Sequence, residues 1–444
     1  MKRFLEKELI FWKNKKDRLP LLLRGARQVG KSYLVEYFGK NHFDNVVVVD
    51  FERRPEIKKA FQSREPSEII KQIEIALQQK IVYGKTLLFF DEIQECPEAF
   101  ISLRYFKELV PELHVIAAGS LMEFLLNHEK YSFPVGRVEF LYLRPFSFLE
   151  FLQAVAPMVA ERLRACATSE KILPLEHEEL LKWVRQYLFV GGMPAAITAF
   201  LTANSLYESQ IVHQRIIQSY QSDFGKYATH AQHRYLQMIF QKAPVIVGHV
   251  LKYIHIDRES RSRDLKPALS LLEQTGLLLR VFATSAAGVP LHAHVKDHRF
   301  KLLYLDVGLL QTACQADATD FFEKDILQIN SGIIAEQFVG QELLTADSPH
   351  LNRSLLFWEK DEGNAEVDYL ITVDAQIIPI EVKAGATGSL RSLHSFMKMK
   401  NSPLGIRISE LPLSLEEGVL SVPFYLVPFI KDLVLLALSN KLKA

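Results

Sequence analysis

RGARQVGKS, residues 24–32, follows the apolar run 21–23 and fits the phosphate-loop pattern GxxxxGK[ST]. In this pattern a strand gives way to a helix, so that free backbone N–H groups at the helix N-terminus can face phosphates. Lys31 can then reach the β- and γ-phosphate oxygens, and Ser32 can bind Mg²⁺. The stretch predicts an ATP site, and its alternative is an ordinary strand–turn–helix. The residues expected to contact the nucleotide are Gly25, Ala26, Arg27, Gln28, Val29, Gly30, Lys31, Ser32 and Tyr33.

A second motif, TLLFFDE at residues 86–92, is an apolar run that ends in two acids. A buried parallel strand has this pattern when it delivers carboxylates at its C-terminal edge. We expect Asp91 to hold Mg²⁺, directly or through water, and Glu92 to act as general base or orienter for the attacking water. The alternative is a strand followed by a helix that the two acids cap.

Two further candidates lie downstream of this motif. Ser120 follows the strand-like run 113–118 and could contact the γ-phosphate or position the water, or it could simply cap a helix at 121–126. Arg137 offers a guanidinium that could stabilise transition-state charge, in its own chain or in a neighbouring subunit. The plain alternative for Arg137 is a solvated surface arginine.

Together these motifs resemble the AAA-type ATPases that carry a domain of unknown function at their C-terminus, the AAA_14/DUF4143 architecture. The resemblance covers nearly the whole chain and implies that Asp91 and Glu92 form the Walker B motif with its catalytic glutamate. It also implies that Ser120 stands at the sensor position. Arg137 matches the Gly-Arg pair of this family, whereas its role as an arginine finger is our inference. The stretches that carry the resemblance are GARQVGKS (25–32), LLFFDEIQ (87–94), AAGS (117–120), GRVEFLYLRPFSFLEF (136–151) and GGMP (191–194).

Composition indicates a multidomain cytoplasmic protein. With 444 residues, 48% of them hydrophobic, the chain has enough apolar side chains for several cores. The net charge of +1 does not indicate that the chain as a whole is attracted to nucleic acid or membrane, so any basic surface must be local. The 3 scattered cysteines indicate a reducing compartment. We expect no signal peptide, because the first thirty residues carry charges throughout and lack an apolar core. We also expect no membrane span, because the apolar segment 424–438 is too short and carries charges.

The predicted fold class is α/β and multidomain. Strands and helices alternate over 1–150, which predicts a P-loop AAA-type ATPase domain on a parallel sheet. Helical periodicity predicts a helical lid over 151–225. Three helices and a hairpin predict a winged-helix domain over 226–310. A C-terminal α/β domain is expected over 311–444.

Basic residues around the expected winged helix could meet DNA phosphates. Acidic residues are mixed among them, so that contact with DNA and a role in protein packing are about equally favoured. The basic residues in question are Arg258, Arg261 and Arg263 before the third helix, and Arg280, Lys296, Arg299 and Lys301 on or near the wing.

The C-terminal third carries a D-x₁₂-ExK set, Asp368, Glu381 and Lys383. Strand alternation places Glu381 and Lys383 on one face of a sheet, where Asp368 could join them from a neighbouring strand. Asp368 and Glu381 would bind Mg²⁺, Glu336 could add a ligand, and Lys383 could orient a water. The set resembles the PD-(D/E)xK nuclease superfamily. One alternative is a surface salt-bridge ladder on a two-strand hairpin. Another is a nuclease-like fold that survives without activity as a binding module.

We therefore expect a Mg²⁺-dependent ATPase that couples ATP binding and hydrolysis to a nuclease-like C-terminal domain acting on DNA, and that forms a homo-oligomer if Arg137 acts between subunits. The alternative is an ATP-switched protein-interaction or signalling module with a catalytically inactive nuclease-like domain. A basic groove leading to Asp368 and Glu381 favours nucleic acid, and an apolar or acidic surface favours a protein partner.

Overall fold

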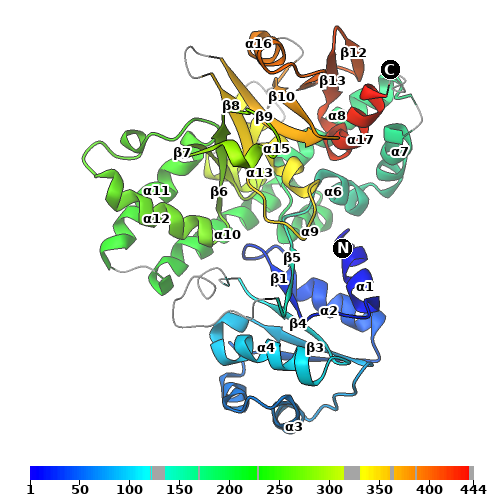
Figure 1. Ribbon diagram of the computed structural model, residues 1–444, viewed down its shortest axis with the longest axis vertical. Coiled ribbons are helices and arrows are strands. Elements are labelled where there is room, and N and C mark those ends of the chain that lie inside the picture. Colours follow the sequence, from blue (N-terminus) through cyan, green and yellow to red (C-terminus); the bar gives the residue numbers. More distant parts are fainter. Residues whose placement is uncertain are drawn as a thin grey trace. The chain divides into compact units, whose positions relative to one another are not determined.

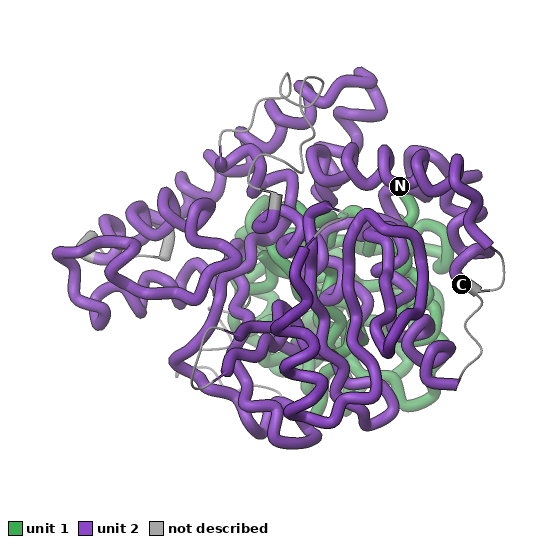
Figure 2. The backbone as a smooth tube through the Cα atoms, turned by 90° about the horizontal axis from the view of Figure 1, so that it is seen from above, with its two compact units in different colours: residues 1–144, 274–276, 348–352 green, residues 145–273, 277–347, 353–444 purple. Residues whose placement is uncertain are grey.

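The structure, a computed structural model, describes residues 1–120, 122, 136–168, 171–227, 230–314, 331–360, 365–385 and 388–439. The chain divides into two units, coloured separately in Figure 2. Unit 1 comprises Met1–Arg144, Gln274–Gly276 and Ser348–Asn352. Unit 2 comprises Pro145–Glu273, Leu277–Asp347 and Arg353–Ala444.

Unit 1 contains a parallel sheet of five strands in the order β2-β3-β4-β1-β5 (Figure 1). Its strands are β1 (Leu21–Arg24), β2 (Asn45–Asp50), β3 (Thr86–Asp91), β4 (His114–Ala118) and β5 (Glu139–Tyr142). Its described α-helices are α1 (Glu6–Asn14), α2 (Lys31–His42), α3 (Pro66–Leu77) and α4 (Pro97–Leu109). All residues of β3 and β4 are buried, as expected for central strands covered on both faces. The P-loop sheet predicted from the sequence is confirmed.

Aromatic rings pack around Phe90, the residue that precedes Asp91 in β3. Phe90 of β3 packs against Phe61 and Phe106, with ring centroids 5.4 Å and 5.8 Å away in edge-on arrangements. Aromatic side chains bury large areas and prefer such edge-on contacts. The backbone of the next residue, Asp91, is therefore held in a closely packed core.

Unit 2 contains a mixed sheet of eight strands in the order β12-β13-β11-β10-β9-β8-β6-β7 (Figure 1). Its strands are β6 (Leu278–Thr284), β7 (Val295–Tyr304), β8 (Leu355–Glu359), β9 (Glu366–Val373), β10 (Gln376–Val382), β11 (Gly405–Ser409), β12 (Ser414–Glu416) and β13 (Val419–Pro423).

The α-helices that the structure describes in unit 2 lie before, between and after these strands along the chain. They are α6 (Phe148–Val155), α7 (Pro157–Thr168), α8 (Pro174–Val190), α9 (Pro194–Ala203), α10 (Leu206–Tyr227), α11 (His230–Ile246), α12 (Ser262–Gln274), α13 (Val307–Ala313), α15 (Ser331–Thr345), α16 (Arg391–Lys400) and α17 (Ile430–Leu438). Within the described ranges no single helix is both long and apolar enough to cross a membrane; one bent pair, α8 with α9 at 118°, meets the requirement by length and composition alone.

The hairpin expected as a wing belongs to the same sheet as the C-terminal strands. β6 pairs with β7 in an antiparallel manner and with β8 in a parallel manner, with Val281 opposite Leu355. The expected boundary at residue 310 therefore passes through one continuous sheet. Pairing between strands so far apart in the sequence leaves no local pattern. The winged helix itself stays a prediction.

The GGMP motif at residues 191–194 has a structural role at the end of α8. Gly191 has φ +67°, and a Cβ there would lie 2.2 Å from the Asp306 carboxylate. The Gly192 N–H donates to Asp306 Oδ2 at 2.6 Å, while Asp306 Oδ1 accepts from Leu309 N at the start of α13. Only residues without a side chain allow this close approach. The motif thus joins α8 to α13 through a buried carboxylate.

Candidate functional site

The loop between β1 and α2 curls around the side chain of Lys31. Gly25 has φ +151°, and a Cβ there would lie 2.2 Å from the Leu143 carbonyl oxygen, so that only glycine fits. Gly30 is left-handed, with φ +93°, and leads directly into α2. The Lys31 ammonium donates to the carbonyl oxygens of Gly25 at 2.9 Å and Ala26 at 2.8 Å. The lysine is thereby held against the backbone of the loop.

Lys31 is buried, with 7% of its surface exposed. Burial, the largest influence, lowers the pKa of Lys31 to about 8, against the opposing effects of the Glu92 and Asp91 carboxylates. An ammonium in such surroundings lacks hydration and is stabilised by an anion that approaches it. The loop is therefore arranged to receive a negatively charged group.

Ser32 and Asp91 lie together at the carboxyl edge of the sheet. The Ser32 side chain hydrogen-bonds to Asp91, whose pKa is raised to about 6, chiefly by burial and in spite of that bond. A hydroxyl next to a carboxylate is a donor set that suits Mg²⁺ with nucleotide phosphates. The residues present therefore fit the metal that the two motifs imply.

Glu92 is held by neighbours from two segments. Its backbone is left-handed, with φ +48°, and its Oε2 accepts from Gln94 Nε2 at 2.6 Å. The same oxygen accepts from the Ser120 backbone N–H at 3.2 Å and from the Ser120 hydroxyl at 3.1 Å. A Cβ on Gly119 would lie 2.1 Å from Gln94 Oε1, so a larger residue there would displace the Gln94 amide. The helix that Ser120 was expected to cap lies outside the described residues except for Met122.

The structure adds residues that the sequence reasoning missed. Gln94 was visible two positions after the glutamate but was given no role. Arg3 is buried and donates to the carbonyl oxygens of Val29 at 3.1 Å and Arg144 at 2.7 Å, so it supports the back of the loop. Gly276, with φ +77°, lies against the loop, because a Cβ there would be 2.9 Å from the Ala26 Cβ. Nothing in the local sequence indicates either contact.

The remaining loop residues differ in exposure. Val29 is fully buried, whereas Tyr33 is 56% exposed and stacks on Tyr37 with the ring centroids 6.1 Å apart. Gln28 is left-handed, with φ +63°. Contact of Arg27, Gln28 and Tyr33 with a nucleotide stays a prediction.

Arg137 is not brought to Lys31 and Glu92. The register pairs Glu139 with Leu21, the first residue of β1, so Arg137 precedes the amino end of β5. The phosphate loop follows the carboxyl end of β1, at the opposite edge of a parallel sheet. Arg137 Nε instead donates to Glu108 Oε1 at 3.0 Å, and Glu108 also accepts from Arg104.

A second cluster of charged residues lies in unit 2, around Lys301 of β7. The Lys301 ammonium lies 2.8 Å from Glu336 Oε1 and 2.6 Å from Glu366 Oε1, and 3.9 Å from Asp368 Oδ1. From the sequence, Lys301 was counted among the basic residues on or near the wing that could meet DNA phosphates. For Lys301 that possibility is wrong, because its side chain is 2% exposed. The apolar context FKLLYL, residues 300–305, was the available signal for burial.

The D-x₁₂-ExK residues are brought together beside Lys301. Asp368 Oδ2 accepts from the Val382 N–H at 2.7 Å, and Lys383 donates to Glu381 Oε1 at 2.6 Å. Glu381 Oε2 is buried and finds no hydrogen-bond partner among the described residues. Burial raises the pKa of Glu336 to about 8 and that of Glu381 to about 7, and it also raises the pKa of Asp368.

This arrangement does not form the metal site expected on Asp368, Glu381 and Glu336. In the part of the chain that the structure describes, no three His, Cys, Asp or Glu side chains are grouped so as to hold a metal ion. The Lys301 ammonium, 2.8 Å from Glu336 and 3.9 Å from Asp368, already supplies a positive charge beside two of these carboxylates. The residues present therefore do not fit a divalent metal in this arrangement.

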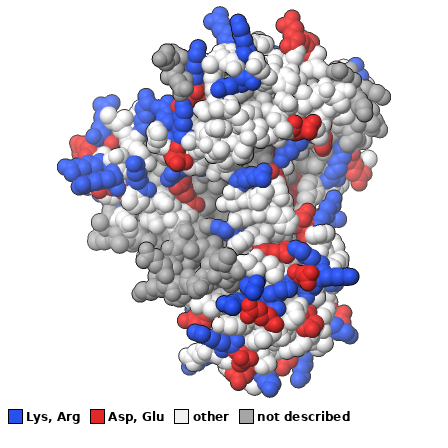
Figure 3. Space-filling view, viewed as in Figure 1, with Lys and Arg blue, Asp and Glu red and all other residues white. Residues whose placement is uncertain are grey.

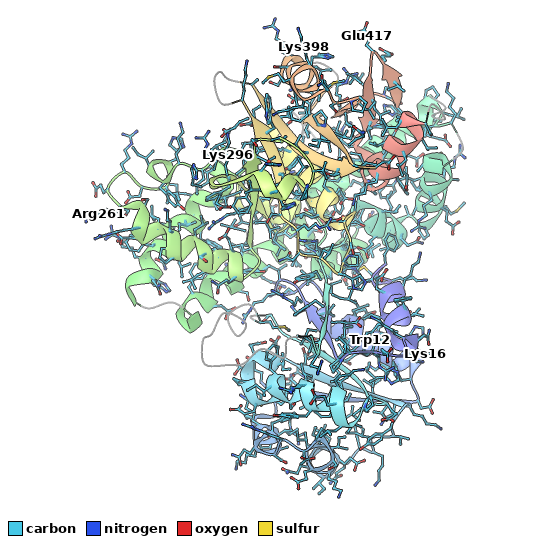
Figure 4. All side chains as sticks on the ribbon, viewed as in Figure 1. Trp12, Lys16, Arg261, Lys296, Lys398 and Glu417 are labelled. Atoms are coloured by element: carbon cyan, nitrogen blue, oxygen red, sulfur yellow. The ribbon has the colours of Figure 1, made fainter. Side chains whose placement is uncertain are left out.

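Two of the other basic residues expected at the wing are paired with acids. Arg280 Nη2 donates to Glu273 at 2.7 Å, and Arg299 Nε donates to Glu359 at 2.8 Å. Exposed arginines remain before and at the start of α12, where Lys and Arg alternate with Asp and Glu on the surface (Figure 3). The side chain of Arg261 points outward from this end of the unit (Figure 4).

Three family matches divide the chain. Residues 17–152 match AAA_14, an AAA domain. Residues 181–320 match DUF8612 and residues 331–425 match DUF4143, both domains of unknown function. The AAA_14 and DUF4143 domains named from the sequence motifs are therefore confirmed, while DUF8612 was not predicted. These matches leave the nuclease resemblance as a prediction.

Solved structures give weak likenesses, and no curated protein matches the chain. The Walker-type ATPase PABY2304 of Pyrococcus abyssi is 15% identical with a TM-score of 0.45, covering 70% of this chain and 95% of that chain. The Aeropyrum pernix ORC1 protein in complex with DNA is 11% identical with a TM-score of 0.28, covering 70% and 90%. The RuvB Holliday junction branch migration motor of Thermotoga maritima is 14% identical with a TM-score of 0.26, covering 62% and 88%.

Proposed function

We propose that this chain, an AAA-type ATP hydrolase that also carries a DUF4143 domain, hydrolyses ATP with Mg²⁺ at the phosphate loop of unit 1. One observation carries the proposal. The Ser32 side chain hydrogen-bonds to Asp91 at the edge of the sheet where the loop and Glu92 also lie. The side chains expected to bind phosphate, hold the metal and activate water therefore lie together at one edge of the sheet.

ATP binding is expected to change the partners of Lys31. Its ammonium now donates to two loop carbonyls, and phosphate oxygens are stronger acceptors because they are charged. When bound, Mg²⁺ would supply positive charge next to the β- and γ-phosphates, with Ser32 and Asp91 as its holders. Glu92 would accept the proton of the attacking water, and Ser120 would hold the carboxylate in place.

Arg137 is proposed to act between subunits. Its place at the opposite edge of the sheet from the loop argues against a role in its own site. An arginine of one chain that reaches the nucleotide of a neighbour requires a homo-oligomer. The Glu108 carboxylate, which pairs with Arg137 in the single chain, would have to release it.

DNA is the proposed partner of unit 2. The support is the group of exposed arginines Arg258, Arg261 and Arg263, which could contact phosphates. Acidic neighbours such as Glu259 and Asp264 keep the second candidate open, a protein partner whose binding responds to ATP. Cleavage of DNA by Asp368, Glu381 and Lys383 is not favoured, because the carboxylates surround a lysine. The proposed role of this region is binding.

The cytoplasm is the proposed compartment. Cys96, Cys166 and Cys314 are free thiols in the structure. Thiols persist where glutathione and thioredoxin keep proteins reduced.

Two measurements test the proposal on the purified full chain. Phosphate release from ATP should require Mg²⁺ and cease when a chelator removes it. Binding of a fluorescent DNA duplex should weaken with rising salt and should differ between ATP and ADP. ATP turnover in the presence of chelator would contradict the first part. Absence of salt-dependent DNA binding would leave the protein partner as the better candidate.

A further inference from the structure

The charged cluster of unit 2 has a lysine at its centre. The ammonium of Lys301 comes from β7, whereas its carboxylate neighbours come from α15 (Glu336) and β9 (Glu366 and Asp368). Glu381 of β10 and Lys383, which follows the last residue of β10, complete the group. The cluster resembles a nuclease-type carboxylate site in its residue types, but Lys301 lies outside the D-x₁₂-ExK set.

We propose that the Lys301 ammonium takes the place of the divalent cation in this carboxylate cluster. A side chain of the same domain then neutralises the carboxylates, and the domain binds its partner without a metal. The inference concerns unit 2 alone. It therefore does not depend on ATP hydrolysis in unit 1, and it deepens the proposed binding role of this region.

The distances are those of an ammonium held by hydrogen bonds. Contacts of 2.8 Å and 2.6 Å to Glu336 and Glu366 suit a charged N–H donor and a carboxylate acceptor. The nitrogen also lies over the Phe357 ring, 5.2 Å from its centre, and this ring is fully buried. A cation over an aromatic face is attracted to the ring. Lys301 is thus held by two acids and one ring, and this makes it a fixed part of the core.

The charges of the cluster depend on Lys301. Buried carboxylates repel one another unless a cation or a proton compensates them. Burial would lower the pKa of Lys301, but the carboxylates of Glu336 and Asp368 raise it overall, so the side chain stays charged. Without this ammonium, the acids around it would lose their compensating charge. Another cation should then be attracted to the same position.

A cavity borders the cluster at Glu366. A cavity of about 580 Å³ is lined by Glu366 together with His249, Lys252 and His255 and by apolar residues of the same segment. A Cβ on Gly248 of this segment would lie 3.5 Å from Glu336 Oε2, so the segment also approaches the second acid. A metal ion can therefore reach the carboxylates once the lysine is removed.

The test is a titration of the nucleotide-free full chain with Mn²⁺. Calorimetry measures the binding of the metal, and thermal unfolding measures the stabilisation that the metal provides. Lys301→Met keeps most of the side-chain volume and removes the charge. We expect this variant to bind Mn²⁺ at least tenfold more tightly than the unaltered protein and to unfold at a higher temperature when Mn²⁺ is present. The double variant Lys301→Met/Asp368→Asn should lose the gain, because a ligand is missing.

Two control variants distinguish the loss of the cation at the centre of the cluster from the loss of any positive charge. Lys301→Arg retains a cation at the centre and should gain no Mn²⁺ binding. Lys296→Met removes a charge from the same strand outside the cluster and should behave like the unaltered protein. Mn²⁺ binding by the unaltered protein that Asp368→Asn abolishes would overturn the proposal. So would a Lys301→Met protein that Mn²⁺ neither binds nor stabilises, including one that stays unfolded with the metal present.

Discussion

The Ser120 hydroxyl lies 3.1 Å from Glu92 Oε2, and the Ser120 backbone N–H lies 3.2 Å from the same oxygen. The two residues follow neighbouring strands, β4 and β3, which pair in parallel. Because both strands end at the same edge of the sheet, the serine meets the carboxylate expected to activate water. This contact gives the residue at the sensor position a direct link to the proposed base.

The contact predicts the effect of Ser120→Ala. The variant loses the hydroxyl donor but keeps the backbone donor, so Glu92 should be less well fixed while the phosphate loop is unchanged. We expect kcat for ATP hydrolysis to fall by about tenfold to hundredfold, since hydrogen bonds to charged groups contribute about 1.5–3 kcal/mol. The dissociation constant of ATP should stay the same. Ser120→Thr, which retains a hydroxyl, should recover part of the rate; equal losses in both variants would contradict a role for the hydroxyl.

Lys31→Ala and Glu92→Gln should impair the ATPase in different ways. Lys31 contacts phosphates before the reaction, so its loss should abolish detectable ATP binding in equilibrium titrations. Glu92 acts on water, so the glutamine variant should bind ATP normally and hydrolyse it at least about a hundredfold more slowly. Turnover by Glu92→Gln close to that of the unaltered protein would remove Glu92 from the role of base.

The ATP site could be predicted because its parts are local or follow from strand order. The loop is contiguous in sequence, and Asp91 and Ser120 each follow an apolar run that reads as a buried strand. Parallel order then brings them to one edge of the sheet. The supporting contacts of Arg3 and Gly276 could not be predicted, because they join distant segments and involve backbone atoms that any residue supplies.

Unit 2 was less predictable for a related reason. Lys301 stands in a hairpin next to other basic residues, and this local view indicated a surface facing DNA. Its burial is decided by α15 and β9, which come later in the chain and supply Glu336 and Glu366. Asp368, Glu381 and Lys383 were correctly expected near one another, since antiparallel β9 and β10 place them at one end of a hairpin. The sequence predicted Mg²⁺ in this cluster, whereas the cation in the structure is the Lys301 side chain.

Gly276 and Gly84 form a matched pair for testing support of the phosphate loop. Both have φ +77°, so alanine costs the same left-handed strain of roughly 1–2 kcal/mol at either position. A Cβ on Gly276 would lie 2.9 Å from the Ala26 Cβ, whereas a Cβ on Gly84 meets nothing within 4 Å. We expect Gly276→Ala to weaken ATP binding about tenfold in equilibrium titrations, equivalent to about 1.4 kcal/mol. Gly84→Ala should bind ATP normally; equal affinities in both variants would show that the contact with the loop is unimportant.

Arg137 should be tested against Arg104, because both pair with the Glu108 carboxylate. If Arg137 acts between subunits, ATPase activity per chain should rise with protein concentration, and Arg137→Ala should flatten that rise. Loss of an arginine finger typically costs about 10³-fold or more in rate. Arg104→Ala loses only an exposed ion pair and should keep the concentration dependence. Constant activity per chain in a protein shown by light scattering to be monomeric would leave Arg137 with a structural role.

Glu342 of α15 is expected to make the stability of unit 2 depend on pH. Its side chain is fully buried and accepts from the Phe148 N–H at 2.9 Å. Burial, with a smaller effect from the Glu150 carboxylate, raises the pKa of Glu342 to about 8 in spite of the hydrogen bond from the Phe148 N–H. Because an unfolded glutamate has a pKa of about 4.3, the folded protein keeps a proton over the interval in which the unfolded chain has released it.

The sign of the effect follows from this difference in bound protons. Stabilisation by protonated Glu342 is complete below a pH of about 4.3 and is lost as the pH rises to about 8, at a rate of at most about 1.4 kcal/mol per pH unit. Glu342→Gln mimics the protonated form and still offers an acceptor to Phe148. We therefore expect its thermal midpoint to fall less than that of the unaltered protein between about pH 6 and pH 8. Glu178→Gln, at an exposed position of α8, should follow the unaltered protein; a parallel decline in all three proteins would show that Glu342 does not hold the proton.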